Sequence, residues 1–160
     1  MAHLLAPKPA EIQLPVFYNV DGVVGARPAT NNREDVLLVQ FAFYLVGQNP
    51  TTISRDVAEA ARAVTVDGVV DPITINAITT LQRAAKRRAG FPSKVVDGRV
   101  SPARGGYRYG SDVWTIANLN NLMQNLYVNI WPRIDNIPGC PPELKAMVKR
   151  QVVGVGKITV

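Results

Sequence analysis

The chain has one cysteine, one histidine and no long apolar run. A single cysteine, Cys140, excludes an internal disulfide and a zinc cluster built from thiolates. A metal site would therefore need carboxylates alone, and we expect neither a resident metal nor a cofactor. The longest apolar stretch, from Val36 to Val46, contains Gln40 and is too short to cross a bilayer, so we expect no membrane insertion.

The first residues also lack a charged start followed by a long apolar region, which is the pattern of a secretory signal peptide. We therefore expect the protein to be made in the cytoplasm without a signal peptide. Its 160 residues, with 47% hydrophobic and 19% charged side chains, are enough for one globular domain with a real core. This composition is not that of a disordered chain.

A turn followed by a helix start is the most informative stretch of the sequence, from Val66 to Gln82. Asp67-Gly68 is a turn pair, because glycine readily adopts the positive φ that other residues avoid. Asp71 is placed as an N-cap, and Pro72 then occupies the first helical position, where a missing N–H costs nothing. Apolar residues follow at helical spacing, which predicts a helix: Ile75, Ile78, Leu81 and Ala85.

The order of these residues, Asp-Gly-x-x-x-Pro-x-Thr-x-x-Ala-Ile-x-x-Leu-Gln, resembles the signature of the peptidoglycan-binding-like domain family. That family is a small three-helix module of cell-wall hydrolases and phage proteins. Asp71 stands where the family usually has glycine, and Leu81 stands where it often has phenylalanine. The resemblance covers about residues 33 to 126 and implies a three-helix module that binds without catalysing.

Asp-Gly turns occur twice more, at Asp21-Gly22 and at Asp97-Gly98. The spacings are too unequal for a solenoid, so we interpret the copies as repeated turn chemistry. Asp67-Gly68 and Asp97-Gly98 fall where the family carries its paired loops. Asp21-Gly22 has no helix straight after it, and we place it outside the module.

Four helices are expected around these turns. The first begins at Asn32, an N-cap with Asp35 three residues later, and is apolar nearly all round. A short second helix covers 53–64, and the central helix runs to about residue 89, with Gly90 beyond its end. Ser111 is expected to cap a last helix that ends before Pro132, and Trp114-Thr115 fills the role of the residue that opens the family's final helix.

The fold class expected is mainly α, in three parts. Residues 1–32 are an extended N-terminal arm, residues 33–131 are the peptidoglycan-binding-like helical module, and residues 132–160 are a C-terminal tail. The tail has the pattern of a short helix from Pro142 to Arg150. Its ending from Val152 to Val160 is apolar and rich in β-branched residues, and one explanation is a strand that adds to the sheet edge of another chain.

No catalytic set is recognisable. The sole histidine is His3, and no serine or cysteine has a base nearby in the sequence. Asp67, Asp71 and Asp97 could form a carboxylate pair for glycoside hydrolysis, but turn and cap chemistry explains each of them better. We therefore expect a protein that is not an enzyme.

The loop from residue 104 to 110 is the strongest candidate for a ligand or partner contact. Tyrosine and arginine side chains on a glycine-rich loop offer flat faces and donors for sugars, bases, carboxylates or phosphates. They are also typical of protein–protein hot spots, and a plain surface loop is an equally good interpretation. The candidate contact residues are Arg99, Arg104, Tyr107, Arg108 and Tyr109.

Positive charge is concentrated in residues 83–108, within a net charge of +6. An anionic partner would suit this stretch, but cations at a helix end and ordinary solvated surface explain it as well. The cations are Arg83, Lys86, Arg87, Arg88, Lys94, Arg99, Arg104 and Arg108, with Asp97 the single acid among them.

Three functions follow, in order. The leading hypothesis is a non-enzymatic structural component of a phage tail or related contractile injection particle. Its expected partners are other subunits of the particle, including copies of itself in a homo-oligomer, and its expected site of action is the bacterial cell envelope. The alternative is a cell-wall binding module that anchors a partner to peptidoglycan. Nucleic-acid binding through residues 83–108 ranks last, because no recognisable reading motif accompanies the charge.

Overall fold

The computed structural model describes residues 2–5, 17–88 and 90–155. This part of the chain is mainly helical, which confirms the expectation of a mainly α fold. It contains five α-helices, two short 3-10 helices and six short strands. The α-helices are α1 (Arg33–Gln48), α2 (Arg55–Arg62), α3 (Pro72–Lys86), α4 (Thr115–Leu126) and α5 (Pro142–Val155).

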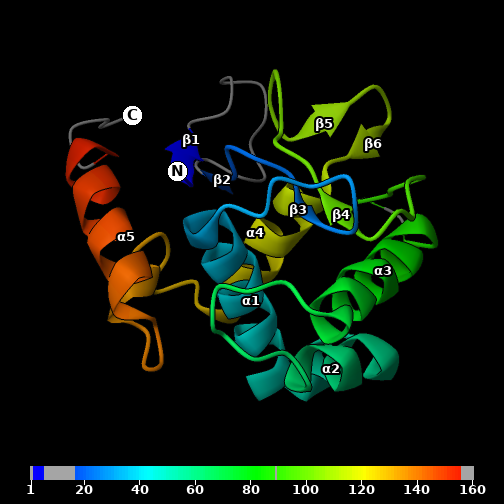
Figure 1. Ribbon diagram of the computed structural model, residues 1–160, viewed down its shortest axis with the longest axis horizontal. Helices are drawn as coiled ribbons and strands as arrows, with labels where there is room; N and C mark the ends of the chain where they lie inside the picture. Colours follow the sequence, from blue (N-terminus) through cyan, green and yellow to red (C-terminus); the bar gives the residue numbers. More distant parts are fainter. Residues whose placement is uncertain (1, 6–16, 89, 156–160) are drawn as a thin grey trace.

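Helix α1 is the centre of the molecule, with α2 and α3 on one side of it and α5 on the other (Figure 1). It packs against α2, α4 and α5. Because its side chains are apolar nearly all round, it can be buried on several sides at once. The large side chains of Leu38, Phe41 and Leu45 are fully buried.

Helix α3 begins as the sequence predicts. Asp71 is its N-cap, and the Asp71 carboxylate accepts a hydrogen bond from the backbone N–H of Thr74 at 2.7 Å, while Pro72 takes the first helical position. The helix ends at Lys86, earlier than expected. The backbone N–H groups of Arg87 and Arg88 bond to the carbonyls three residues earlier, those of Ala84 and Ala85, which closes the last turn. The expected final residue, Ala89, lies outside the described part.

Two other caps differ from the prediction. Asn32 is the N-cap of α1, as predicted, but its side chain makes no capping bond and donates instead to Asp35 Oδ2 at 3.2 Å. Helix α4 begins at Thr115 with Trp114 as N-cap, as the resemblance implies, and not after Ser111. Ser111 instead lies in the turn between two short strands, and α4 ends at Leu126, before Pro132.

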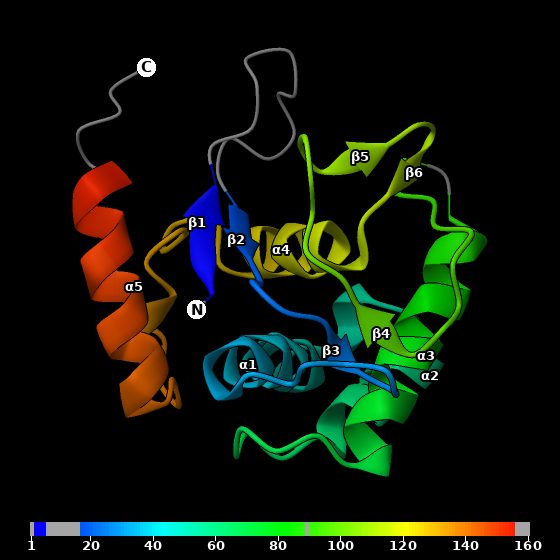
Figure 2. The same cartoon turned by 45° about the horizontal axis from the view of Figure 1, so that its top comes forward.

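The strands form three antiparallel pairs. The strand β1 (His3–Leu5) pairs with β2 (Phe17–Asn19), and β5 (Arg108–Tyr109) pairs with β6 (Asp112–Val113). The third pair joins β3 (Val24–Gly25) to β4 (Arg99–Val100). Figure 2 shows β3 and β4 side by side next to α3. This pairing joins the N-terminal part of the chain to the segment that follows α3.

The N-terminal segment belongs to the hydrophobic core. Phe17 and Tyr18 are fully buried, and Ala2 is buried in the same cluster. The side chain of Asn120 in α4 accepts a hydrogen bond from the backbone N–H of Tyr18 at 2.6 Å and donates one to its carbonyl at 2.7 Å. Residues 6–16 of the expected arm lie outside the described part.

The C-terminal segment packs on the same core. After the 3-10 helix η2 (Ile134–Asn136), helix α5 buries Leu144 and Met147. It continues past the expected end at Arg150, so the predicted strand is wrong over residues 152–155, and residues 156–160 lie outside the described part. An ion pair of 2.9 Å between Arg33 and Glu143 joins α1 to α5, and the Arg33 hydrogen bond lowers the pKa of Glu143.

Candidate functional site

The three Asp-Gly turns are called here the first corner (Asp21-Gly22), the second corner (Asp67-Gly68) and the third corner (Asp97-Gly98). The second corner is held by Gln40 of α1. The Gln40 Oε1 accepts from the backbone N–H groups of Asp67 at 3.1 Å and Gly68 at 2.8 Å. Its Nε2 lies within hydrogen-bond distance of Asp67 Oδ1 (3.2 Å), the Val69 carbonyl (2.9 Å) and Thr74 Oγ1 (3.3 Å).

The third corner is held in the same way by Gln82 of α3. The Gln82 Oε1 accepts from the backbone N–H groups of Asp97 at 3.0 Å and Gly98 at 2.9 Å. Its Nε2 lies near Asp97 Oδ1 (3.1 Å), the Arg99 carbonyl (2.8 Å) and Thr115 Oγ1 (3.2 Å). Gln82 therefore joins the third corner to the base of α4.

A glutamine suits this position because its amide carries both an acceptor and two donors. A buried corner needs an acceptor for two backbone N–H groups and a donor for its carbonyl. Gly68 and Gly98 take φ values of 78° and 68°, which glycine adopts readily. Both corners can be predicted from the sequence, but the role of the glutamines was not predicted. The available signal is Gln40, the one polar amide in the apolar run from Val36 to Val46.

The first corner has a different partner. Asp35, at the third position of α1, accepts from the backbone N–H groups of Asp21 at 3.1 Å and Gly22 at 2.9 Å. The sequence analysis placed this corner outside the module. In the structure its continuation packs against the third corner, because the Ala26 N–H donates to the Gly98 carbonyl at 3.0 Å.

The predicted contact residues Tyr107 and Arg108 make contacts within the chain. Tyr107 is only 5% exposed and stacks on Phe91, with ring centroids 6.0 Å apart. The Arg108 guanidinium lies 5.3 Å from the centre of the Tyr107 ring and donates to the Gly90 carbonyl at 2.8 Å. The Tyr107 ring is therefore not available to a sugar or a base.

The other three predicted contact residues lie nearby in different settings. The Tyr109 ring packs against Trp114, with centroids 4.4 Å apart, and burial raises the pKa of Tyr109. Arg99 pairs with Asp97 at 3.2 Å. Arg104 is exposed and has no ionic partner among the residues that the structure describes. Of the five, Arg104 is the most accessible to a ligand.

A cleft that the sequence analysis did not anticipate lies between the segment before α2, the end of α3, and α4. Its volume is about 490 Å³, which is within the range of small-molecule sites. Figure 1 shows α2 and α3 next to each other, with α4 nearer the centre of the molecule. The cleft is lined by Thr51, Ile53, Ser54, Leu81, Ala84, Ala85, Arg87, Arg88, Asn118 and Leu122.

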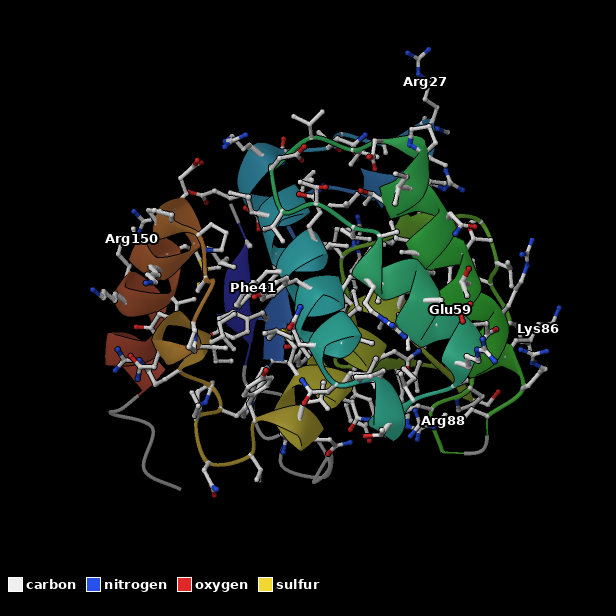
Figure 3. All side chains as sticks on the ribbon, turned by 90° about the horizontal axis from the view of Figure 1, so that it is seen from below. Arg27, Phe41, Glu59, Lys86, Arg88 and Arg150 are labelled. Carbon is white, nitrogen blue, oxygen red and sulfur yellow. The ribbon has the colours of Figure 1, made fainter. Side chains whose placement is uncertain are left out.

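Two arginines give the cleft a positive edge. Arg87 lies 3.9 Å from Asp56, a long ion pair between exposed side chains. The pKa of Asp56 is lowered chiefly by a hydrogen bond from Ser54, with Arg87 adding to the effect. Arg88 has no ion pair or hydrogen bond from its side chain within the described part of the chain. Figure 3 shows Lys86 and Arg88 at one end of the molecule and Arg150 at the opposite end.

Asn118 of α4 gives the cleft an unmatched polar group. The residue is 6% exposed, and its Nδ2 is buried without a hydrogen-bond partner among the described residues. A buried donor without a partner costs about 1–3 kcal/mol. Such groups are rare in folded proteins and call for an explanation. Asn118 and Arg88 thus bring two unmatched donors to one cleft.

The remaining groups with chemical interest are few. Cys140 is buried, as expected, and burial raises the pKa of its thiol to about 12. Within residues 2–5, 17–88 and 90–155, no three histidine, cysteine or carboxylate side chains gather as a metal site would require.

None of the helices in this part is both long and apolar enough to cross a membrane. No family model, curated protein or solved structure matches the chain.

Proposed function

We propose that the chain is a non-enzymatic binding module that retains peptidoglycan at the cleft between the segment before α2, the end of α3, and α4. The second and third corners, with α1, α3 and α4, correspond to the three helices and paired Asp-Gly loops of the peptidoglycan-binding-like domain that the sequence resembles. Gln40 and Gln82 support the correspondence, because each joins its own helix to an Asp-Gly corner and to the first turn of a later helix.

The cleft is the observation on which this proposal depends. It combines an aliphatic floor with unmatched hydrogen-bond donors, which is the usual composition of a ligand site. Arg88 and Arg87 favour a ligand with negative charge, and peptidoglycan carries carboxylates. The helices that form the cleft are fixed relative to one another by the third corner, so the site is largely preformed.

Retention on purified sacculi tests the proposal. Arg88→Ala should reduce retention about ten-fold, because a charge-assisted hydrogen bond contributes about 1.5–3 kcal/mol. Arg83→Ala is the matched control, since it removes the same charge from the last turn of α3, five residues earlier and outside the cleft. Equal retention of the unmodified protein, Arg88→Ala and Arg83→Ala would contradict binding at this cleft.

The loop from residue 104 to 110, which continues into the hairpin of β5 and β6, is the competing binding location on the same protein. Tyr107→Ala would remove a buried ring, so lost retention could report unfolding. Arg104→Ala is the better probe, because Arg104 is exposed. If Arg104→Ala lost retention on sacculi and Arg88→Ala kept it, peptidoglycan would bind at the loop from residue 104 to 110.

The second candidate is a structural subunit of a phage tail or related contractile particle. The described parts of the arm and tail pack within their own chain, so contacts to neighbours would have to come from other surfaces. Val69 and Ile73 at the start of α3 are 61% and 45% exposed, which favours a contact there. Light scattering tests this: Ile73→Asp should dissociate an oligomer, and a strict monomer at high concentration would contradict it.

A further inference from the structure

We propose that the cleft binds the free carboxyl end of a short peptide with small aliphatic side chains. This inference rests on the proposed function, since the stem peptides of peptidoglycan carry such ends, and it assigns the contact to peptide and not to sugar. Three features of the cleft carry it: the side chains of its floor, the charge at its edge, and the buried amide in its wall.

The floor is aliphatic. Leu81 and Ala85 of α3 and Leu122 of α4 line it, and no aromatic side chain is among the lining residues. Sugar rings are commonly held by stacking on aromatic faces, and the rings of Tyr107 and Tyr109 pack on other rings of the chain. Methyl-sized side chains, by contrast, gain free energy from burial against leucine and alanine. The floor therefore suits an aliphatic peptide better than a sugar.

The edge is suited to a carboxylate. A guanidinium group presents paired N–H donors that match the two oxygens of a carboxylate, and this pairing is stronger than a neutral hydrogen bond. Arg88 is the available group, because Arg87 is partly engaged with Asp56 at 3.9 Å. A terminal carboxylate at Arg88 would lie at the mouth of the cleft, where charge can remain hydrated.

The wall offers a donor for a peptide carbonyl. Asn118 of α4 lines the cleft together with the two arginines that follow α3, and its Nδ2 is buried without a partner among the described residues, so a turn of this side chain would present the donor to a ligand. A peptide carbonyl would satisfy this donor and remove the cost of leaving it unpaired. A peptide end carries a carboxylate and a carbonyl on either side of one small side chain, and the cleft offers partners for all three.

Titration with N-acetyl-Ala-Ala, in its L and D forms, tests the assignment, with the C-terminal amide of each peptide as the matched probe. We expect the free acid to bind at least ten-fold more tightly than the amide, with shifts of the Asn118 side-chain amide signals in NMR spectra. Arg88→Gln should abolish the difference, whereas Arg83→Gln should preserve it. Equal binding of acid and amide, or an unchanged preference in Arg88→Gln, would overturn the assignment.

Sacculi stripped of stem peptides by an amidase separate this inference from the proposed function. Loss of retention on the stripped material, with peptide binding in solution, supports both. Equal retention on stripped and intact sacculi would assign the contact to glycan, which overturns the inference and leaves the proposed function standing. Peptide binding without any retention on sacculi would overturn the proposed function alone, and neither form of binding would overturn both.

Discussion

Gln40 of α1 and Gln82 of α3 make equivalent hydrogen bonds to two successive corners. In each case the Oε1 accepts from the two backbone N–H groups of an Asp-Gly pair, and the Nε2 reaches a threonine in the first turn of a later helix, Thr74 of α3 or Thr115 of α4. Each glutamine thus ties its own helix to a corner and to the start of a later helix. We expect the geometry of α1, α3 and α4, and with it the cleft, to depend on these two side chains.

Replacing Gln82 by leucine should lower the free energy of unfolding by about 2–4 kcal/mol, because several buried backbone groups lose their partners. Gln40→Leu should have a similar effect, since the two sets of bonds match. Chemical denaturation measures both. Gln48→Leu, at an exposed position near the end of α1, is the control and should change stability by less than about 0.5 kcal/mol. Losses no larger than that of Gln48→Leu would show that the corners are not held this way.

Gly25→Ala should be among the most destabilising changes to a glycine of this chain. Gly25 has a φ of 124° in β3, and a Cβ there would overlap the carbonyl oxygen of Gly98. We expect a loss of about 3 kcal/mol. Gly105→Ala is the control, since Gly105 also has a positive φ, 73°, but open space around it, and should cost about 1–2 kcal/mol. Equal losses would mean that the β3–β4 contact contributes little.

Asp71→Ala should cost about 1 kcal/mol at pH 7, the usual value of an N-cap. Hydrogen bonds from the Thr74 hydroxyl and N–H lower the pKa of Asp71 in the folded protein. A lowered pKa stabilises the fold above the unfolded value of about 3.9, and this contribution is lost as the pH falls through the folded pKa. The cost of Asp71→Ala, measured by denaturation from pH 7 to about pH 3, should therefore shrink. A constant cost would contradict a charged cap.

Asn120→Leu should loosen the N-terminal segment. The Asn120 side chain satisfies both backbone groups of Tyr18, so its loss leaves them buried and unpaired, at about 2–4 kcal/mol. Hydrogen exchange should rise in residues 17–19 more than in α3. Asn125→Leu, at an exposed position of the same helix, is the matched control and should leave exchange unchanged. Unchanged exchange in Asn120→Leu would show that the segment is held by its apolar side chains alone.

The parts of the fold that the sequence predicts are those with local causes. The start of α3 follows from Asp71 and Pro72, whose effects act within one helical turn. The burial of α1 follows from its apolar side chains. The start of α4 at Thr115 came from the resemblance and is confirmed, whereas the cap assigned to Ser111 is wrong, because the two-residue strands around it are too short to show any periodicity.

The parts that the sequence does not predict depend on distant residues. The bond between Tyr18 and Asn120 spans 102 positions of the chain, and nothing near either residue indicates it. The same holds for the cleft, whose lining comes from three separate segments. Asp35 shows how a local pattern can mislead: three residues after Asn32 it resembles a capping box, but its carboxylate accepts from the first corner instead.

The packing of α5 against β1 has a practical consequence. This side of the molecule lies opposite the arginine-bearing end of α3 (Figure 1). Coupling the protein to a bead or sensor chip through an exposed side chain of α5, such as Lys149, would orient every copy with the cleft facing the solution. Surface-based affinity measurements could then be made without the support masking the groups under test.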